Sequence, residues 1–569
     1  MPERAMASSP MQFTRAQKAF TMAGALLGLL LAALDQTIVA TAGPAIQQDL
    51  DIPPALYPWL TTSYLVASTM MVPVWGKLSD LMGRRAVLVM GICIFLVGSF
   101  LCGVSQTTLA LVLFRAVQGF GSAALFTAAL AVVADLYPPR ERGKYQGLFG
   151  AVFGLSSVVG PLVGGFITDQ LSWHWVFFIN VPVGAVALTL IFLRMPALKP
   201  PGVQGRRLDW LGAGALALAV VPLLLALSLG RGADTNEPGG YPWGSPPILA
   251  MFAVAAVGTV LFAWRELRAP EPLLDPSLFR LRTFSAANLA VFLVGAVFLA
   301  SVVFLPLFMV NVVGLSATRA GLTITPLTLG VMAGNVLSGQ LVARVGHYKA
   351  LLLGSLALLL AGFAVMAFTL TPDSGPVEVT VKMVMVGLGL GPSIPLYTVA
   401  VQNAVPPERI GVATSASTFF RQLGMTVGVA LLGTVFAGTL GGELSTRTES
   451  AIAGAPADVK ATVSQAAPPE QPFPADAVKQ RLHEGYALQR RHVEGRRGPT
   501  ADRARVDADE QRALATVDKV QRARKESFTQ ATRAIYRCAI LVALAALLAT
   551  LAMPEQPLRR TREPATHKP

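Results

Sequence analysis

Charged residues are scarce in this chain. Lys, Arg, Asp and Glu make up 14% of its 569 residues, whereas a soluble globular protein carries about 25%. Apolar residues reach 53%, and the mean hydropathy is +0.56. This composition excludes a soluble globular fold and indicates an all-α protein that crosses a membrane many times. No signal-peptide pattern precedes the first apolar run, so residues 1–19 are expected to form a cytoplasmic tail.

Cysteine and histidine are also rare. Cys93, Cys102 and Cys538 lie in apolar runs, where a thiol usually serves as a small core residue, and their spacing fits neither a disulfide framework nor a metal site. The five histidines are scattered. No nucleophile–base pair or phosphate loop is evident either. We therefore expect no metal, no cofactor and no enzymatic activity.

The net charge of +14 raises the question of a nucleic-acid partner. Lys and Arg lie in short loops between apolar runs rather than on one face, so no nucleic acid is expected. The positive-inside rule accounts for them better. The expected surroundings are a lipid bilayer, and the expected state is a monomer.

Fourteen apolar runs of about 20 residues are long enough to cross a bilayer. Basic loops alternate between them, which places both termini inside, with Arg559, Arg560 and Arg562 in the C-terminal tail 553–569. The predicted spans are 20–41, 57–76, 86–104, 109–133, 145–168, 175–193, 209–229, 247–264, 284–311, 320–342, 350–370, 377–402, 412–438 and 531–552.

An internal repeat divides these spans. "PPRERG" (138–143) recurs as "PPERIG" (406–411), and "GKLSDLMGRR" (76–85) has a weaker copy in "GQLVARVGHY" (339–348). The repeat predicts a six-helix bundle at 20–193, a two-helix linker at 194–282 and a second six-helix bundle at 283–552. Many secondary transporters are built from related halves of this kind.

Residues 441–530 interrupt the second half with many charges and a Pro-rich stretch. This segment is predicted to lie outside, between spans 13 and 14, and 501–526 reads as a polar helix that continues into the last span. Two interpretations stay open: a solvated cap or partly disordered loop, and a dedicated extension that handles substrate or binds a partner.

Asp35 is the carboxylate that lies deep within a predicted span, where a bare charge costs roughly 2.5 kcal/mol or more. Arg115, in span 4, lies at a similar depth, roughly 9 Å from the same surface at 1.5 Å per residue. The two side chains are therefore candidate partners facing the cavity between the halves. Burial raises the pKa of a carboxylate and a nearby guanidinium lowers it, so Asp35 is predicted to exchange a proton during transport. A static ion pair is the alternative.

The loop between spans 2 and 3 is a candidate cytoplasmic gate. Gly76 and Gly83 permit a tight turn and a close helix approach, and Asp80 can face a helix N-terminus or a loop arginine. Arg84 and Arg85 anchor the inner face. An ion pair that forms and breaks here can act as a latch between conformations.

Span 5 carries a candidate kink, because Pro161 frees a backbone carbonyl among glycines. The residues of this kink are Gly160, Pro161, Gly164 and Gly165. Arg421 lies within span 13, where it can bind an anion, complete a polar network or reach inward to the membrane surface; these alternatives stay open. Candidate apolar and cation–π contacts to substrate come from Phe149, Phe153, Phe304, Phe308, Phe419 and Phe420.

These motifs together resemble the fourteen-span drug:proton antiporter branch of the major facilitator superfamily. "LDQTIVATAGPAI" (34–46) is similar to its first-span motif, 76–85 to the superfamily's signature loop and "GPLVGG" (160–165) to its fifth-span antiporter motif. "LVLFRAVQGFGSA" (111–123) is similar to its fourth-span motif, whose arginine is associated with proton transfer, and "WHWVFFINVPVG" (173–184) and 402–424 match the same branch. The resemblance covers nearly the whole chain except 441–530. Ser156 and His174 depart from the usual glycine and arginine.

The resemblance implies a twelve-helix alternating-access core with a two-helix linker in a bacterial inner membrane. It further implies export of hydrophobic, often cationic drugs in exchange for protons, so small amphipathic substrates and protons are the expected partners. The alternative function is export of lipid or lipid-linked cargo, with 441–530 shielding acyl chains outside.

Overall fold

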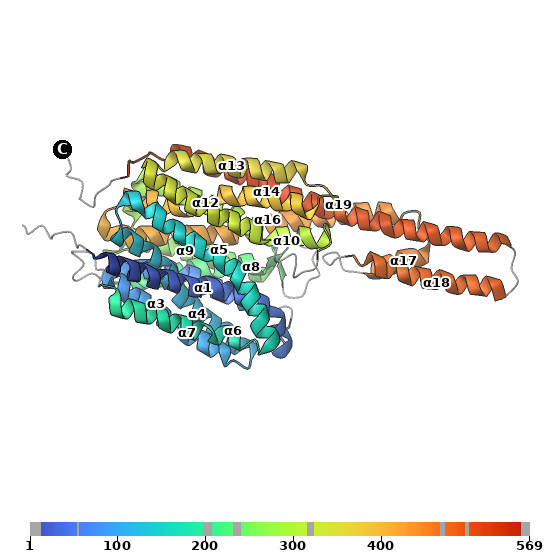
Figure 1. Ribbon diagram of the computed structural model, residues 1–569, viewed down its shortest axis with the longest axis horizontal. Helices are drawn as coiled ribbons and strands as arrows, with labels where there is room; N and C mark the ends of the chain where they lie inside the picture. The colour runs from blue at the N-terminus through green and yellow to red at the C-terminus, as the bar shows by residue number, and fades with distance from the viewer. Residues whose placement is uncertain are drawn as a thin grey trace, which may run out of the picture.

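The computed structural model describes residues 13–53, 56–196, 207–231, 240–315, 324–466, 473–495 and 500–558. Most of the predicted N-terminal tail and the tail arginines Arg559, Arg560 and Arg562 lie outside these residues. The described chain is almost entirely helical, because a backbone in lipid must satisfy its hydrogen bonds within its own segment (Figure 1).

Two helical bundles lie side by side along a common long axis (Figure 1). The N-terminal bundle contains α1 (Arg15–Asp49), α2 (Trp59–Met82), α3 (Arg84–Gly103), α4 (Thr108–Leu136), α5 (Pro139–Gln170), α6 (Trp175–Phe178) and α7 (Asn180–Arg194). The C-terminal bundle contains α10 (Arg282–Asn311), α12 (Ile324–Val345), α13 (Lys349–Thr369), α14 (Pro376–Leu390), α15 (Ser393–Ala404), α16 (Ile410–Ile452) and α19 (Thr500–Ala552).

The linker adds a helix pair, in which α8 (Trp210–Leu229) packs against α9 (Pro246–Arg268). The short remaining elements are β1 (Gly230–Arg231), β2 (Tyr241–Pro242), η1 (Pro276–Arg280) and η2 (Pro407–Arg409).

Thirteen stretches of the described chain are long and apolar enough to cross a membrane. They include α6 with α7, and α14 with α15, each pair forming one span. The α2 helix is not among them, since polar residues such as Thr61, Thr62 and Tyr64 lower its hydropathy, but it packs between α4, α8 and α16. The remaining predicted span, 57–76, falls in α2.

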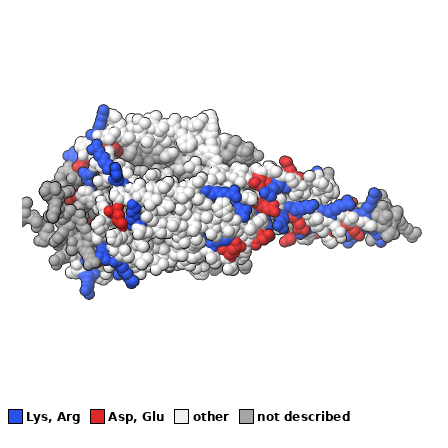
Figure 2. All heavy atoms as spheres, turned by 90° about the horizontal axis from the view of Figure 1, so that it is seen from above, with Lys and Arg blue, Asp and Glu red and all other residues white. Residues whose placement is uncertain are grey.

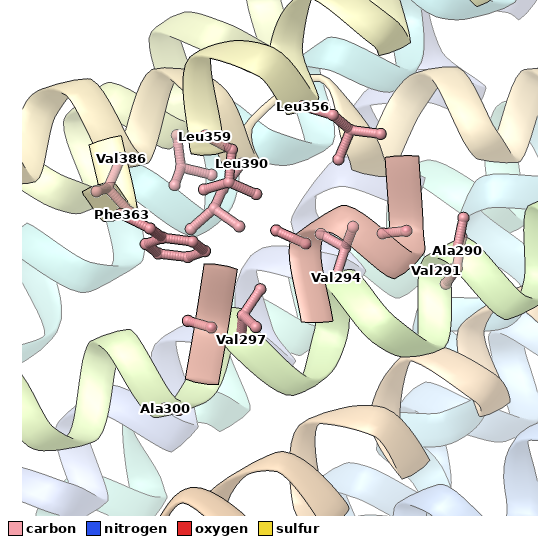
Figure 3. Packing of buried hydrophobic residues seen from close by; sticks show 14 of the residues in the cluster. Ala290, Val291, Val294, Val297, Ala300, Leu356, Leu359, Phe363, Val386 and Leu390 are labelled. Carbon is pink, nitrogen blue, oxygen red and sulfur yellow. The ribbon is translucent and has the colours of Figure 1, made fainter. Parts of the chain in front are cut away.

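The core of the C-terminal bundle is a continuous apolar cluster. Figure 3 shows its centre, where small and branched residues of α10, among them Ala290, Val294 and Val297, face Leu359 and Phe363 of α13. These side chains are at most 4% exposed. The side of α10 that faces α13 is therefore tightly packed. This packing fixes the rotation of α10 about its own axis.

The two copies of the repeat occupy equivalent positions in the fold. The N-terminal copy places Gly76 of α2 against Gly411 and Ser415 of α16, and the C-terminal copy places Gly339 of α12 against Gly143 of α5. Gly83 and Gly346, at matching places in the two copies, both have positive φ, 92° and 83°, which favours glycine. The turns at Gly83, Pro138 and Gly346 mark what we call the basic end of the bundle.

The close approach of α5 and α12 predicts that Gly339→Val opens the basic end. A Cβ at Gly339 falls against the Gly143 carbonyl oxygen, and overpacking costs about 1–3 kcal/mol, enough to lower the closed population about tenfold. The measurement is the distance between spin labels on Glu141→Cys and Ala350→Cys in a chain whose three native cysteines are replaced.

The matched control for this substitution is Gly354→Val in α13, because a Cβ there meets no atom within 4 Å. A label distance that stays unchanged in Gly339→Val, with α5 and α12 still in contact, contradicts the steric argument.

An extension projects beyond the bundle (Figure 1). It is formed by the far end of α16, α17 (Ala457–Ala466), α18 (Ala475–Gly495) and the first half of α19. The predicted polar helix that runs into the last span is confirmed, since α19 is continuous from Thr500 to Ala552. Salt bridges join the elements, for example Arg447 to Glu526 at 2.7 Å.

The extension also has an apolar core of its own, which includes Val478, Leu482, Tyr486 and Val517. Surface ion pairs contribute about 0–1 kcal/mol each, so this core is the main source of its stability. The extension is therefore a folded helical unit rather than a disordered loop in its described part.

Candidate functional site

Asp35 and Arg115 are in direct contact inside the N-terminal bundle. Arg115 Nη1 lies 2.6 Å from Asp35 Oδ2, and both side chains are almost wholly buried. The α1 helix supplies the acid and α4 the guanidinium, as their equal depth in the sequence predicts. A charge pair in such a dry setting is stable only when further hydrogen bonds satisfy both groups.

Those hydrogen bonds come from residues that the sequence analysis did not single out. Gln118 Nε2 donates to Asp35 Oδ1 at 2.8 Å, and Asn180 Nδ2 donates to the same oxygen at 3.0 Å. Asn180 lies within 173–184, a motif noted for its family resemblance, but its uncharged side chain gave no sign of this role. The carboxylate of Asp35 thus accepts three hydrogen bonds from three side chains.

Arg115 is equally well held. Its Nε donates to the Leu60 carbonyl at 3.1 Å, and its guanidinium carbon lies 4.4 Å from the centre of the Tyr64 ring. Tyr64 in turn donates to Ser122 at 2.6 Å. Arg115 is therefore held by contacts that do not involve Asp35.

The surroundings of Asp35 differ from the prediction in one respect. The sequence predicts that Asp35 faces the cavity between the halves, but its side chain has no exposed surface in this conformation. The carboxylate is enclosed by α1, α4 and α7, because the amides of Gln118 and Asn180 cover it. Bulk water therefore has no access to the carboxylate in this conformation.

Asp80 joins the two bundles at the basic end. Its carboxylate accepts hydrogen bonds from the backbone N–H groups of Gly411 at 3.0 Å and Val412 at 2.8 Å, at the N-terminus of α16. Arg84 donates to Asp80 at 2.6 Å and to Asp135 at 2.8 Å. The predicted contact of Asp80 with a helix N-terminus or a loop arginine takes both forms at once. Asp135, at the end of α4, was not predicted.

At the α5–α12 interface a cation contacts a helix C-terminus, whereas Asp80 is an anion at a helix N-terminus. Arg140, in the first turn of α5, donates from Nε to the Ala343 carbonyl at 2.8 Å and from Nη2 to the Arg344 carbonyl, at the C-terminus of α12. A cation at a helix C-terminus is favourable, as an anion is at an N-terminus. Both inter-bundle contacts therefore hold the basic end closed.

Arg85 and the linker contribute at the same end. Arg85 donates to the Phe192 carbonyl of α7 at 2.9 Å, so it anchors its own bundle and takes no part in the contact with α16. The linker bridges both bundles, because Glu271 pairs with Lys77 at 2.6 Å and Asp275 pairs with Arg409 at 2.6 Å.

The predicted kink residues pack against the helix that carries Asp35. A Cβ at Gly160 falls against Thr37, and one at Gly164 comes within 3.4 Å of Ile38. Thr37 also donates to the Ser156 carbonyl at 3.0 Å. Gly165 is less crowded, and α5 runs through Pro161 as one helix. These glycines let α5 lie directly beside the turn of α1 that follows Asp35.

A cavity in the C-terminal bundle is bounded by α10, α15 and α16. Arg421 lies in its wall. The full lining is Val291, Val294, Gly295, Phe298, Ser393, Ile394, Thr398, Ser417, Thr418, Arg421 and Met425.

The predicted phenylalanines lie elsewhere. Phe304 and Phe308 are buried in the core of the C-terminal bundle, and Phe149 in that of the N-terminal bundle. Phe153 stacks on Phe126, and Phe420 contacts Phe419 edge-on. None of the predicted phenylalanines lines this cavity, whereas Phe298 does. Aromatic residues on an apolar helix cannot be assigned to core or cavity from the sequence, since both positions are apolar.

The described surface of the extension offers little to an acyl chain. Leu488 is the one large apolar residue of the described extension with high exposure, at 59%. The other large apolar side chains there are buried or half-buried. The lipid-shielding interpretation therefore draws no support from this surface.

Two helical bundles of related sequence, joined by a linker and carrying buried charges at membrane depth, define a secondary transporter. The chain belongs to the Major Facilitator Superfamily, whose family model matches residues 25–429. It is a membrane transporter and not an enzyme.

Several curated relatives are named for multidrug resistance or efflux. The chain is 40% identical to Multidrug resistance protein 3 of Bacillus subtilis over 421 residues, which cover 74% of this chain and 80% of that protein. It is 38% identical to the Multidrug transporter protein MdtP of the same species, with coverages of 79% and 81%. An MFS-type efflux pump of Arthroderma benhamiae is 32% identical, with coverages of 74% and 78%.

Solved structures agree on the fold. The human organic anion transporter MFSD10 (TETRAN) matches with a TM-score of 0.52 and 18% identity, covering 74% of this chain and 94% of that one. The proton:xylose symporter XylE matches with the same TM-score and 14% identity, covering 74% and 88%. At these identities the likeness concerns the fold alone.

Proposed function

We propose that this transporter is a proton-coupled antiporter that exports amphipathic drugs by alternating access. Asp35 is the coupling acid, and Arg115 is the partner that biases its protonation. The observation that carries the proposal is the fully buried contact between these two residues, hydrogen-bonded by Gln118 and Asn180. Such a group holds its charge when paired and takes up a proton when the pairing weakens.

The inter-bundle contacts support alternating access. Asp80 and Arg140 close the basic end through contacts that involve only a few polar atoms, so they can break without unfolding either bundle. The conformation described is the one closed at that end. The opposite state requires the same contacts to open.

We further propose that the basic end is cytoplasmic, in a bacterial inner membrane, with both termini inside. On the face that Figure 2 shows, the charged residues at the end opposite the extension are mostly Lys and Arg, the extension carries both signs, and a band between them has few charged residues. Since cytoplasmic loops carry an excess of Lys and Arg, this arrangement supports an external position for the extension.

Proton entry supplies enough energy for export. One inward proton yields about 2.3 kcal/mol per 100 mV and about 1.4 kcal/mol per pH unit. We expect proteoliposomes with an imposed pH gradient to exchange an amphipathic dye, such as ethidium, for protons, with dye movement and lumenal pH recorded together. Dye movement with no proton counterflow at any gradient contradicts the proposal.

A further inference from the structure

Arg421 is a half-buried cation with no partner among the described residues. It makes no hydrogen bond and no ion pair with any other residue that the structure describes, and its side chain borders the cavity between α10, α15 and α16. It lies eleven residues after Ile410, the first residue of α16, or about 16 Å along the helix axis. That is about half of the roughly 30 Å hydrocarbon core, where an unpaired cation is costly.

The cavity wall holds no acid to balance this charge. Its lining contains no Asp and no Glu, and the paired charges of Asp35 and Arg115 lie in the other bundle. Arg421 is also too far from either membrane surface to reach a headgroup by extending along the helix. Of the three roles that the sequence leaves open for Arg421, an anion-binding role fits best.

The hydroxyl groups of the lining point to the same conclusion. Ser393 donates to the Leu390 carbonyl, Thr398 to Ile394 and Thr418 to Thr414. Ser417 donates to the Asn288 side chain at 2.8 Å. Each hydroxyl has thus used its one proton. Arg421 is the lining side chain whose N–H groups remain free, so a ligand must present hydrogen-bond acceptors to it.

The rest of the wall is apolar. Val291, Val294 and Phe298 of α10 and Met425 of α16 surround the polar patch. Gly295 packs against the Arg421 backbone, since a Cβ added at Gly295 would lie 2.6 Å from the Arg421 carbonyl oxygen. The α10 and α16 helices are thus in close contact beside the guanidinium. The arginine is therefore presented by a rigid wall.

We propose that Arg421 binds the oxyanion of an amphipathic cargo, a carboxylate or sulfonate on an apolar body. A guanidinium offers a planar fork of donors that matches an oxyanion bidentately. This inference rests on the proposed transport function in one respect: it assumes that the cavity binds the transported cargo. It extends the cargo from the cations expected of the family to anions and zwitterions.

The test is direct binding by the full chain in nanodiscs of zwitterionic lipid, without any gradient. The probes are radiolabelled 2-naphthalenesulfonate and the neutral 2-naphthalenesulfonamide, which share one apolar body. A hydrogen bond to a charged group corresponds to about tenfold or more in affinity, so we expect the sulfonate to bind at least that much more tightly. Arg421→Gln should abolish the difference, and Arg421→Lys should retain part of it.

Three further outcomes decide the inference. If the wild type binds both probes equally, the inference fails, even if ethidium still exchanges for protons. If the sulfonate binds through Arg421 while no proton exchange occurs, the inference stands and the antiport proposal fails. If anionic lipid in the nanodisc displaces the sulfonate in the wild type, the site stands and its occupant is a lipid headgroup.

Discussion

Asp35→Asn is expected to abolish proton-coupled exchange while leaving the transporter folded. The substitution keeps the shape of the side chain and its ability to bond with Gln118 and Asn180, but it removes the group that gains and loses a proton. Dye movement driven by a pH gradient should fall to the level of empty liposomes. Lumenal pH, recorded in the same vesicles, should show no proton release upon addition of dye.

Asp35→Asn is also expected to lower the free energy of unfolding, because Arg115 is buried. Removing one member of a buried pair costs about 3–5 kcal/mol, because Arg115 is left without its counter-charge. The melting temperature of the purified protein should therefore fall without loss of its helical signal. Asp35→Glu retains a carboxyl group and should recover part of the exchange.

The matched control is Asp169→Asn, which changes an exposed carboxylate near the end of α5. It should exchange dye and protons as the wild type does. An Asp35→Asn protein that exchanges at the wild-type rate would show that the Asp35–Arg115 pair is a static structural contact.

Asp80→Asn is expected to shift the transporter toward the state open at the basic end. The carboxylate accepts two backbone N–H groups at the N-terminus of α16 and pairs with buried Arg84. A partly buried anion at a helix N-terminus contributes up to about 2 kcal/mol, which corresponds to an about thirtyfold change in an equilibrium constant. The label pair at Glu141 and Ala350 should report a longer distance.

Two comparisons make the gate prediction specific. Arg140→Gln weakens the α5–α12 contact and should shift the label distance in the same direction, whereas Asp169→Asn should leave it unchanged. A label distribution in Asp80→Asn that equals that of the wild type would show that the Asp80 contacts do not hold the basic end closed.

The match between prediction and structure follows from how local each property is. Hydropathy belongs to each segment by itself, so fourteen apolar runs could be read as spans from the sequence. Thirteen of them correspond to helices long and apolar enough to cross a membrane, and the run 57–76 corresponds to the more polar α2. The pairing of Asp35 with Arg115 was also accessible, because equal depth and opposite charge in a low-dielectric medium restrict the partners of each group.

Other features depended on which helix faces meet. Gln118 and Asn180 are uncharged, so nothing in their own segments marked them as partners of Asp35. Phe304 and Phe308 were predicted to contact substrate, and the structure places both side chains in the core of the C-terminal bundle. The rotation of an apolar helix about its axis is set by packing against its neighbours, and an apolar run carries little periodicity to reveal it.

By itself, the sequence determined that this protein crosses a membrane many times, and it predicted two related halves with an acid and an arginine paired in the first. The cost of placing charge in lipid makes those conclusions nearly independent of detailed packing. Only the tertiary structure decided that Asp35 is sealed within its bundle, that the extension has its own core and that Arg421 is unpaired. Each of these depends on contacts between residues far apart in the chain, which no single segment encodes.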